Sequence, residues 1–237
     1  MKVVSFNNIK TIIQIFNYYI YSLVPNIPIN LEVLQDKNFV TLKWKMPEKI
    51  TGVVRDFKVN ITHLKTLYQV PKECHFSDDH KIVIVNETQY STLILNPYSE
   101  YVFNVYAENG IGISNCSESK FFYTLPSSPS PPRNLSIEFG PLDIADLVSN
   151  VSGKVSWLPP CYSNGNITGY KIKLFGTKVN HENHDFSKKI FQNKNSSTFG
   201  NLLLDYNYKI QLTAFGFGIQ GEPSVIHIKT PSGSKKI

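Results

Sequence analysis

The sequence predicts an all-β protein made of two consecutive β-sandwich domains. Three observations lead to this fold class: strict alternation of apolar and polar residues, a set of anchor residues that occurs twice, and no comparably long run with helical spacing. Alternation indicates strands with one buried face, because successive side chains of a strand point to opposite sides of the sheet. The chain has 237 residues, 41% of them hydrophobic, which suits two globular domains.

The repeated anchors are a tryptophan, a leucine and, six residues after the leucine, a tyrosine. The two sets are Trp44, Leu95 and Tyr101, and Trp157, Leu202 and Tyr208. Each tyrosine opens an alternating segment that is followed within a few residues by a Gly-x-Gly turn. A repeat on the scale of about a hundred residues indicates two similar domains, each with its own core.

In the first copy, alternation predicts strands over 40–45, 57–62 and 101–107. The strand after the second of these has two possible positions, 81–86 and 68–72. We favour 81–86, because it aligns with the second copy.

In the second copy, the same pattern predicts strands over 154–157, 170–174 and 208–214. At the corner of a β-sandwich a tyrosine ring packs inside, and its hydroxyl bonds to main chain a few residues upstream. Tyr101 and Tyr208 fit that role, so with the tryptophans and leucines they form the expected structural core.

The pattern resembles a tandem pair of fibronectin type III domains, which are immunoglobulin-like β-sandwiches. The residues that carry the resemblance are Pro28-Ile-Asn-Leu31, Trp44-Lys-Met-Pro47, Leu95-Asn-Pro97 and 101–112, and then Pro131-Pro132-Arg-Asn-Leu135, Trp157-Leu-Pro159-Pro160, Gly169-Tyr170, Leu202 and 208–221. Immunoglobulin domains usually pair cysteines between two core strands, whereas the strands that carry the tryptophans and tyrosines here contain no cysteine.

The resemblance implies a domain order. We expect a fibronectin type III domain at 25–126, a Pro-rich linker at 127–132, a second domain at 133–231 and a tail at 232–237. Residues 1–24 are poorly defined: they could be a weak signal peptide or the remnant of a preceding domain. Proline at the density of the linker favours a short semi-rigid strut.

The resemblance also implies a function: a non-catalytic extracellular module that binds proteins or acts as a spacer in a cell-surface receptor or adhesion protein. Receptor-type tyrosine phosphatases and neuronal adhesion receptors are the most similar owners of such arrays. The expected partner is a protein ligand or another cell-surface receptor, with no nucleic acid, and with membrane contact only through a segment absent from this chain. The net charge is +6, and most lysines sit singly on the outward faces of strands, without a dense basic cluster in the sequence.

Two other function classes stay open: an intracellular structural array of fibronectin type III domains, and an accessory binding module of an enzyme. We expect no catalytic residue, cofactor or metal in this chain. The densest group of potential ligands, Cys74, His75, Asp78, Asp79 and His80, lacks the paired spacing of a zinc site. His181, His184 and Asp185 occupy the corresponding loop of the second copy.

Asn-x-Ser/Thr sequons indicate a secreted or cell-surface protein. They begin at Asn60, Asn86, Asn115, Asn134, Asn150, Asn166 and Asn195. Asn60 falls on the outward phase of its strand, and the others fall in turns, loops or strand ends. All seven positions could therefore carry a glycan without burying it.

The three cysteines leave at least one without an internal partner. If the strand after 57–62 is 81–86, Cys74 lies at the same end as Cys161; if that strand is 68–72, Cys74 lies nearer to Cys116. A Cys74–Cys161 bridge and three free thiols are both open. Loops of rigid sandwiches usually carry binding specificity, so the candidate contact points are 110–114, 161–168 and 216–221. The longer connection 140–153 is either a further contact point or a tolerated insertion.

Overall fold

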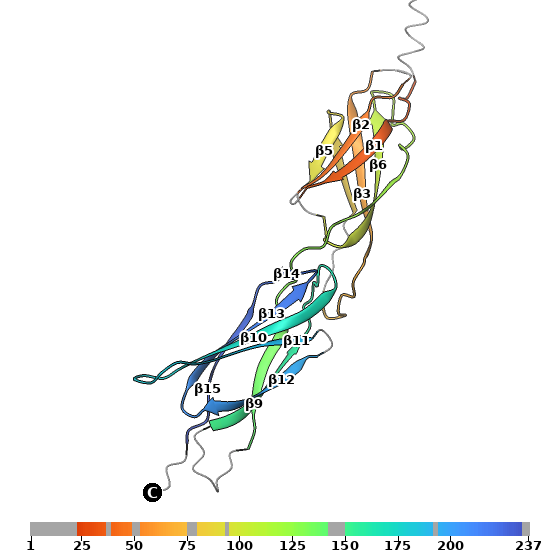
Figure 1. Ribbon diagram of the computed structural model, residues 1–237. Coiled ribbons are helices and arrows are strands. Elements are labelled where there is room, and N and C mark those ends of the chain that lie inside the picture. The colour runs from red at the N-terminus through yellow and green to blue at the C-terminus, as the bar shows by residue number, and fades with distance from the viewer. Residues whose placement is uncertain are drawn as a thin grey trace, which may run out of the picture. The chain divides into compact units, whose positions relative to one another are not determined.

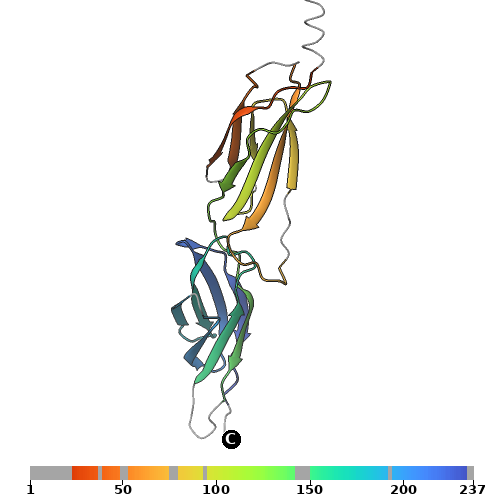
Figure 2. The ribbon, with the colours of Figure 1, turned by 90° about the vertical axis from the view of Figure 1, so that its right-hand side faces the viewer.

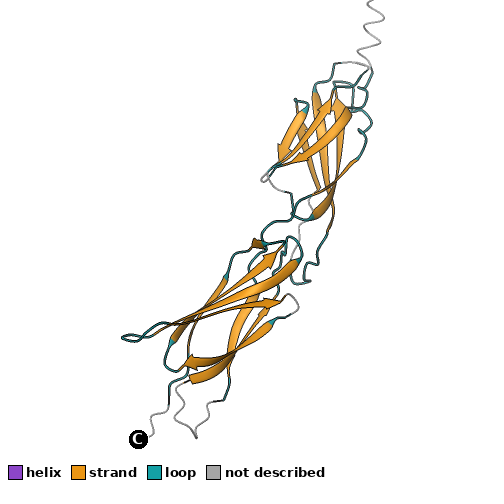
Figure 3. Cartoon of the chain, in the orientation of Figure 1, coloured by secondary structure: helices purple, strands orange, loops and turns teal. Residues whose placement is uncertain are grey.

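The computed structural model of the chain consists of strands and the loops between them (Figures 1 and 3). It describes residues 23–36, 39–48, 53–74, 80–92, 95–141, 150–191 and 194–233. These residues contain no helix, which confirms the predicted all-β fold class. It follows that none of the described segments is a long apolar helix of the kind that crosses a membrane.

Contacts divide the chain into two units. The first consists of Met1–Thr66 and Ser77–Leu125, and the second of Leu67–Phe76 and Pro126–Ile237. The expected terminal segment 1–24 lies outside the described residues except for its last two positions. Residues 142–149 of the 140–153 connection and residues 234–237 of the tail also lie outside the described residues.

The first unit contains two antiparallel sheets. One has the order β1-β2-β5 and the other β4-β3-β6-β7. The strands are β1 Ile29–Gln35, β2 Val40–Lys45, β3 Asp56–Thr66, β4 His80–Val85, β5 Gln89–Thr92, β6 Ser99–Glu108 and β7 Lys120–Tyr123. β4 pairs with β3, with Phe57 opposite Val85 at one end and Thr62 opposite His80 at the other. The strand after β3 therefore lies close to 81–86, the favoured of the two positions.

The core of the first unit lies between these two sheets. Trp44 of β2 meets Phe57 of β3 edge to face, with ring centroids 5.5 Å apart, and Tyr101 of β6 is fully buried. Leu95 is half-buried and packs against the same cluster. Alternation decides which residues are buried: in β6 every second side chain from Ser99 onward points inward.

The second unit repeats this plan. One sheet has the order β12-β9-β8; in the other, β11, β10 and β13 follow one another, and both β14 and β15 pair with β13. The strands are β8 Arg133–Phe139, β9 Asn150–Leu158, β10 Ile167–Thr177, β11 His184–Phe191, β12 Ser196–Leu203, β13 Asn207–Gly216, β14 Ile219–Gln220 and β15 Ser224–Lys229. The two sheets lie face to face (Figure 2). Trp157, Leu202 and Tyr208 are buried between them.

Each unit has a corner built on its tyrosine. The main-chain N–H of Asn96 donates to the Tyr101 hydroxyl at 2.8 Å. The main-chain N–H of Leu203 donates to the Tyr208 hydroxyl at 3.1 Å, and His184 Nδ1 lies 2.8 Å from the same oxygen. Burial raises the pKa of Tyr208. In both units the tyrosine, on β6 or β13, is thus bonded to a main-chain group five residues earlier in the sequence.

A buried threonine completes each corner. Thr124 Oγ1 accepts from the main-chain N–H of Ser99 at 2.9 Å and donates to the carbonyl of Asn96 at 2.7 Å. In the second unit, Thr230 Oγ1 does the same with the N–H of Tyr206 and the carbonyl of Leu203, at 2.9 and 2.7 Å. Sequence analysis did not single out these threonines, although each follows the last strand of its copy directly.

Candidate functional site

The seven sequon asparagines are all accessible in the folded chain. Asn60 and Asn150 are half-buried, and the five exposed ones are Asn86, Asn115, Asn134, Asn166 and Asn195. A glycan attached at any of them would extend into solvent. The folded structure is therefore compatible with modification at every sequon.

Asn60 differs from the other sequon asparagines because it lies in the middle of a sheet face. It pairs with Ile82 on β4 and with Asn104 on β6. Ile82 and Ile84 are 60% and 61% exposed on that face, and the Thr62 hydroxyl of the sequon lies 3.4 Å from Asn60 Oδ1 and donates to it. The site thus combines an attachment point with exposed apolar surface.

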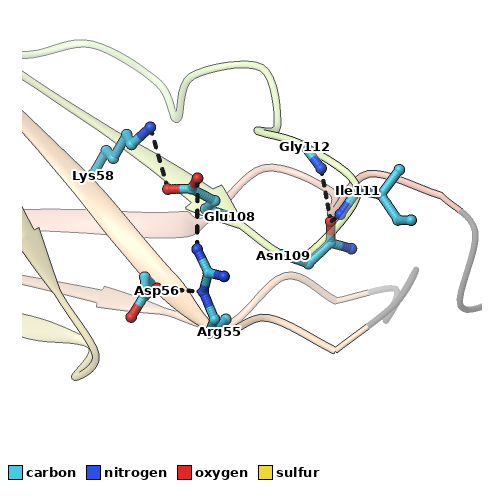
Figure 4. Close-up of polar contacts among 7 residues, drawn as sticks. All are labelled: Arg55, Asp56, Lys58, Glu108, Asn109, Ile111 and Gly112. Carbon is cyan, nitrogen blue, oxygen red and sulfur yellow. Dashed lines mark hydrogen bonds and ion pairs between the residues drawn. The ribbon is translucent and has the colours of Figure 1, made fainter.

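The turn after β6, within the predicted contact point 110–114, is held by Asn109 (Figure 4). The Asn109 side-chain oxygen accepts from the main-chain N–H groups of Ile111 at 2.9 Å and Gly112 at 3.1 Å. Its Nδ2 donates to the carbonyl of Leu23 at 2.9 Å. Because its backbone is tied in this way, the turn presents the exposed Ile111 side chain from an ordered loop.

Charged residues gather beside this turn (Figure 4). Lys58 Nζ lies 3.2 Å from Glu108 Oε2, and Arg55 lies 3.8 Å from Glu108 Oε1 and 2.7 Å from Asp56 Oδ2. The Asp56 carboxylate raises the pKa of Arg55 first through its hydrogen bond. Since lysine and arginine here balance two carboxylates, the turn is a polar contact point without strong net charge.

A disulfide joins Cys74 to Cys161 within the second unit. The Cα atoms are 5.6 Å apart and the cysteines are separated by 87 positions in the sequence. Of the two alternatives that the sequence left open, the structure therefore contains the bridge. Cys116 is exposed and takes no part in a disulfide.

Polar contacts surround this disulfide. The Tyr68 hydroxyl donates to Asn164 Oδ1 at 3.3 Å, and Asn164 Nδ2 donates to the carbonyl of Ser128 at 2.8 Å. Burial raises the pKa of Tyr68. Arg133 contacts Glu73 at 3.0 Å, and the pKa of Glu73 is lowered, first by a hydrogen bond with its own main chain and then by Arg133. The predicted contact loop 161–168 is therefore anchored at several points.

Only part of the densest group of potential metal ligands, at which we expect no metal site, lies within the described residues. Cys74 is in the disulfide, and His75, Asp78 and Asp79 lie outside the described residues. His80 Nδ1 lies 3.2 Å from the hydroxyl of Thr62. No group of three or more histidine, cysteine, aspartate or glutamate side chains able to hold a metal ion occurs within the described ranges.

Strand pairing gathers lysines that are dispersed in the sequence. Lys171 of β10 is the cross-strand partner of Lys189 of β11, and Lys173 is the next outward residue along β10. The apolar residues Phe191 and Phe215 flank the same strand. Sequence analysis missed this cluster, because residues far apart in the sequence become neighbours only through the register.

Comparison with known proteins shows that the fibronectin type III domain matches residues 26–122 and 130–229. Similar proteins include phosphatidylinositol phosphatase PTPRQ of Rattus norvegicus, with 28% identity over 81% of this chain. Others are receptor-type tyrosine-protein phosphatase F of Danio rerio, with 32% identity over 63% of the chain, and neuronal cell adhesion molecule of Rattus norvegicus, with 35% identity over 53%.

The chain spans 8%, 7% and 10% of the lengths of these three relatives. The phosphatase domains of the first two lie outside the aligned region. The two family matches together cover most of the chain, and both units have the paired sheets, tryptophan core and tyrosine corner described above. The chain belongs to the fibronectin type III family and contains two domains of it.

Proposed function

We propose that this chain is a non-catalytic, extracellular protein-binding and spacer module of a cell-surface receptor or adhesion protein. The observation that carries the proposal is the disulfide between Cys74 and Cys161. Disulfides form and persist in oxidising compartments and are rare in the cytosol. The relatives named as receptor or adhesion proteins support the same setting.

The sequons give independent support for a secretory route. None of the seven asparagines is buried, so a folded glycoprotein could carry sugar at each of them. An intracellular structural array would leave these sites unmodified and its thiols reduced. The extracellular module therefore accounts for more of the observations.

The mechanism is presentation of surfaces on a rigid scaffold. The ordered turn at Asn109 and the anchored loop at Asn164 hold exposed side chains in fixed positions, which lowers the entropy cost of binding. No catalytic step is required of the chain. Its partners are proteins or other cell-surface receptors.

The test is to express the chain behind a strong secretion signal in mammalian cells and to measure its intact mass before and after glycosidase treatment. We expect a large loss of mass and conversion of several sequon asparagines to aspartate by the glycosidase. A folded, secreted but unglycosylated protein whose three cysteines all react with an alkylating reagent would contradict the proposal. The intracellular array would then become the better explanation.

Asn60 allows a sharper version of this test. A glycan there would cover the exposed Ile82 and Ile84, so its loss should uncover apolar surface. We expect Thr62→Ala, which destroys that sequon, to increase self-association measured by light scattering. The matched control is Ser197→Ala, which destroys the sequon at Asn195 and should have no such effect.

A further inference from the structure

The outward face of β10, the strand labelled in the second unit of Figure 1, carries an apolar region next to a basic one. Tyr170 and Ile172 point into the core, so Gly169, Lys171 and Lys173 point outward. The cross-strand partners extend the face over β11 and β13. We call this surface the lysine–phenylalanine face and define it by Gly169, Lys171, Lys173, Lys189, Phe191 and Phe215.

A cavity opens at the apolar end of this face. It has a volume of about 280 Å³, and Gly169, Tyr170, Phe191 and Phe215 are among its lining residues. Phe191 is 79% exposed. Gly169 pairs with Phe191 on one side and Phe215 on the other, so the missing side chain leaves a gap between two aromatic rings.

The glycine is required by the close approach of the strands. A Cβ atom at this position would lie 2.6 Å from the main-chain carbonyl oxygen of Ile190, which is far inside van der Waals contact. The apolar gap is therefore built into the pairing of β10 with β11. An aliphatic or aromatic side chain of a partner would fill it.

The basic end of the face begins one outward position further along β10. Lys171 and Lys173 line a second hollow of about 100 Å³ together with Gln211 and Thr213 of β13. Lys189, exposed on β11, pairs with Lys171 and also lines the apolar cavity. Three ammonium groups thus stand on neighbouring positions of two adjacent strands.

Two acidic residues lie at the ends of this surface. Asp185 pairs with Phe175, two residues beyond Lys173, and the exposed Glu222 precedes Pro223 at the edge of the second hollow. Among the described residues, the ion pairs of the second unit join Arg133 to Glu73 and include none of the three lysines. Their charge is therefore available for an acidic partner.

We propose that the lysine–phenylalanine face docks an acidic protein segment. One aliphatic or aromatic residue of the segment would sit over Gly169 between Phe191 and Phe215, and aspartate or glutamate residues would reach the lysines. Outward positions on a strand are about 7 Å apart. An extended partner would therefore place its acidic residues about two and four positions from the apolar anchor.

The apolar cavity favours a protein partner over a sulfated glycan. Lysines alone would suit either polyanion, but a gap between two phenylalanines gains most from an apolar side chain. This inference rests on the proposed function and names the chemistry of the partner.

The experiment selects binders from a random-sequence dodecapeptide library displayed on phage, with the secreted full chain as target. The enriched peptides should combine aspartate or glutamate with an apolar residue about two to four positions away. Binding of the best synthetic peptide is then measured by fluorescence anisotropy. Its affinity should fall as the salt concentration rises.

Variants locate the binding site. Lys171→Glu with Lys173→Glu should weaken binding by at least about tenfold, and Phe191→Ala by about threefold or more. The charge-matched control, Lys43→Glu with Lys154→Glu, changes exposed lysines on other sheets. It should leave affinity within about twofold, as should Phe121→Ala, an exposed aromatic control in the first unit.

Three results would overturn the inference: no enriched peptide, enriched peptides without an acidic excess, or equal affinity for the double lysine variant. Heparin fragments provide the other arm. If they bind in a manner that depends on Lys171 and Lys173 but not on Phe191, and acidic peptides do not bind, the face is a glycan site. The selection is repeated on glycosidase-treated protein, because peptide docking does not need the glycans. Failure of the docking proposal is then distinguishable from failure of the proposed extracellular function, which is tested by the glycans and the disulfide.

Discussion

Replacing Tyr208 with phenylalanine tests the corner of the second unit. The change removes one oxygen atom and keeps the buried ring. It leaves the main-chain N–H of Leu203, now bonded to that oxygen at 3.1 Å, without its acceptor. His184 also loses a contact, but it is half-buried and water can replace the hydroxyl there. The bond to Leu203 is part-buried, so its loss falls at the lower end of the roughly 1–3 kcal/mol that an unsatisfied buried donor costs, and we expect the second unit to lose about 1–1.5 kcal/mol of stability.

The two tryptophans allow each unit to be observed separately. Trp44 lies in the core of the first and Trp157 in the core of the second, and the sequence contains no other. With 5-fluorotryptophan incorporated, ¹⁹F NMR in increasing urea follows one signal for each unit. For an m-value of about 1–2 kcal/mol per molar urea, the midpoint of the Trp157 signal should move down by about 0.5–1.5 M.

The control is Tyr101→Phe, which removes the equivalent hydroxyl in the first unit. It should shift the Trp44 signal and leave the Trp157 signal in place. If Tyr208→Phe leaves the Trp157 midpoint unchanged, the corner hydrogen bond does not stabilise the unit. That result would refute the reasoning.

Three further predictions concern the cores, a turn and a carboxylate. Trp44→Ala or Trp157→Ala should cost about 3–5 kcal/mol in its own unit by emptying a core site. Because each variant loses the tryptophan signal of its own unit, urea unfolding is followed by circular dichroism, and wild-type midpoints in both variants would contradict the core assignment. Asn109→Ala removes acceptors for two main-chain N–H groups and should cost the first unit about 1–3 kcal/mol, measured from the Trp44 signal. The pKa of Glu100 lies below its ordinary value because its carboxylate accepts a hydrogen bond from Lys65 and, with a smaller effect, one from Tyr123. Its stabilising contribution is therefore complete above the unfolded-state pKa and is lost as the pH falls through the folded-state pKa. Lys65→Met should raise the pKa of Glu100 in an NMR titration, and an unchanged value would exclude the ion pair.

Much of the fold could be predicted because its main signals are local. Alternation in 57–62 and 101–107 reflects one buried face of a sheet, and the structure places these residues in β3 and β6. The ambiguity over the next strand was harder, because the connection after β3 leaves the first unit at Leu67 and returns at Ser77. The local sequence pattern does not predict that residues 67–76 belong to the second unit.

The candidate sites were predicted less completely for a physical reason. A disulfide depends on the distance between Cα atoms, here 5.6 Å across 87 positions, which sequence spacing does not determine. The lysine–phenylalanine face likewise depends on register, since Lys171 and Lys189 become neighbours only when β10 pairs with β11. The outward placement of the sequons was predicted from strand phase and loops, whereas the exposed apolar neighbour of Asn60, Ile82, is set by strand pairing and required the fold.

The most direct test of the extracellular proposal is the cysteine connectivity of protein secreted from mammalian cells. The protein is alkylated without reduction, digested, and analysed by mass spectrometry. The account predicts a peptide pair joined through Cys74 and Cys161 and an alkylated Cys116. Full alkylation of all three cysteines in folded protein would contradict the account.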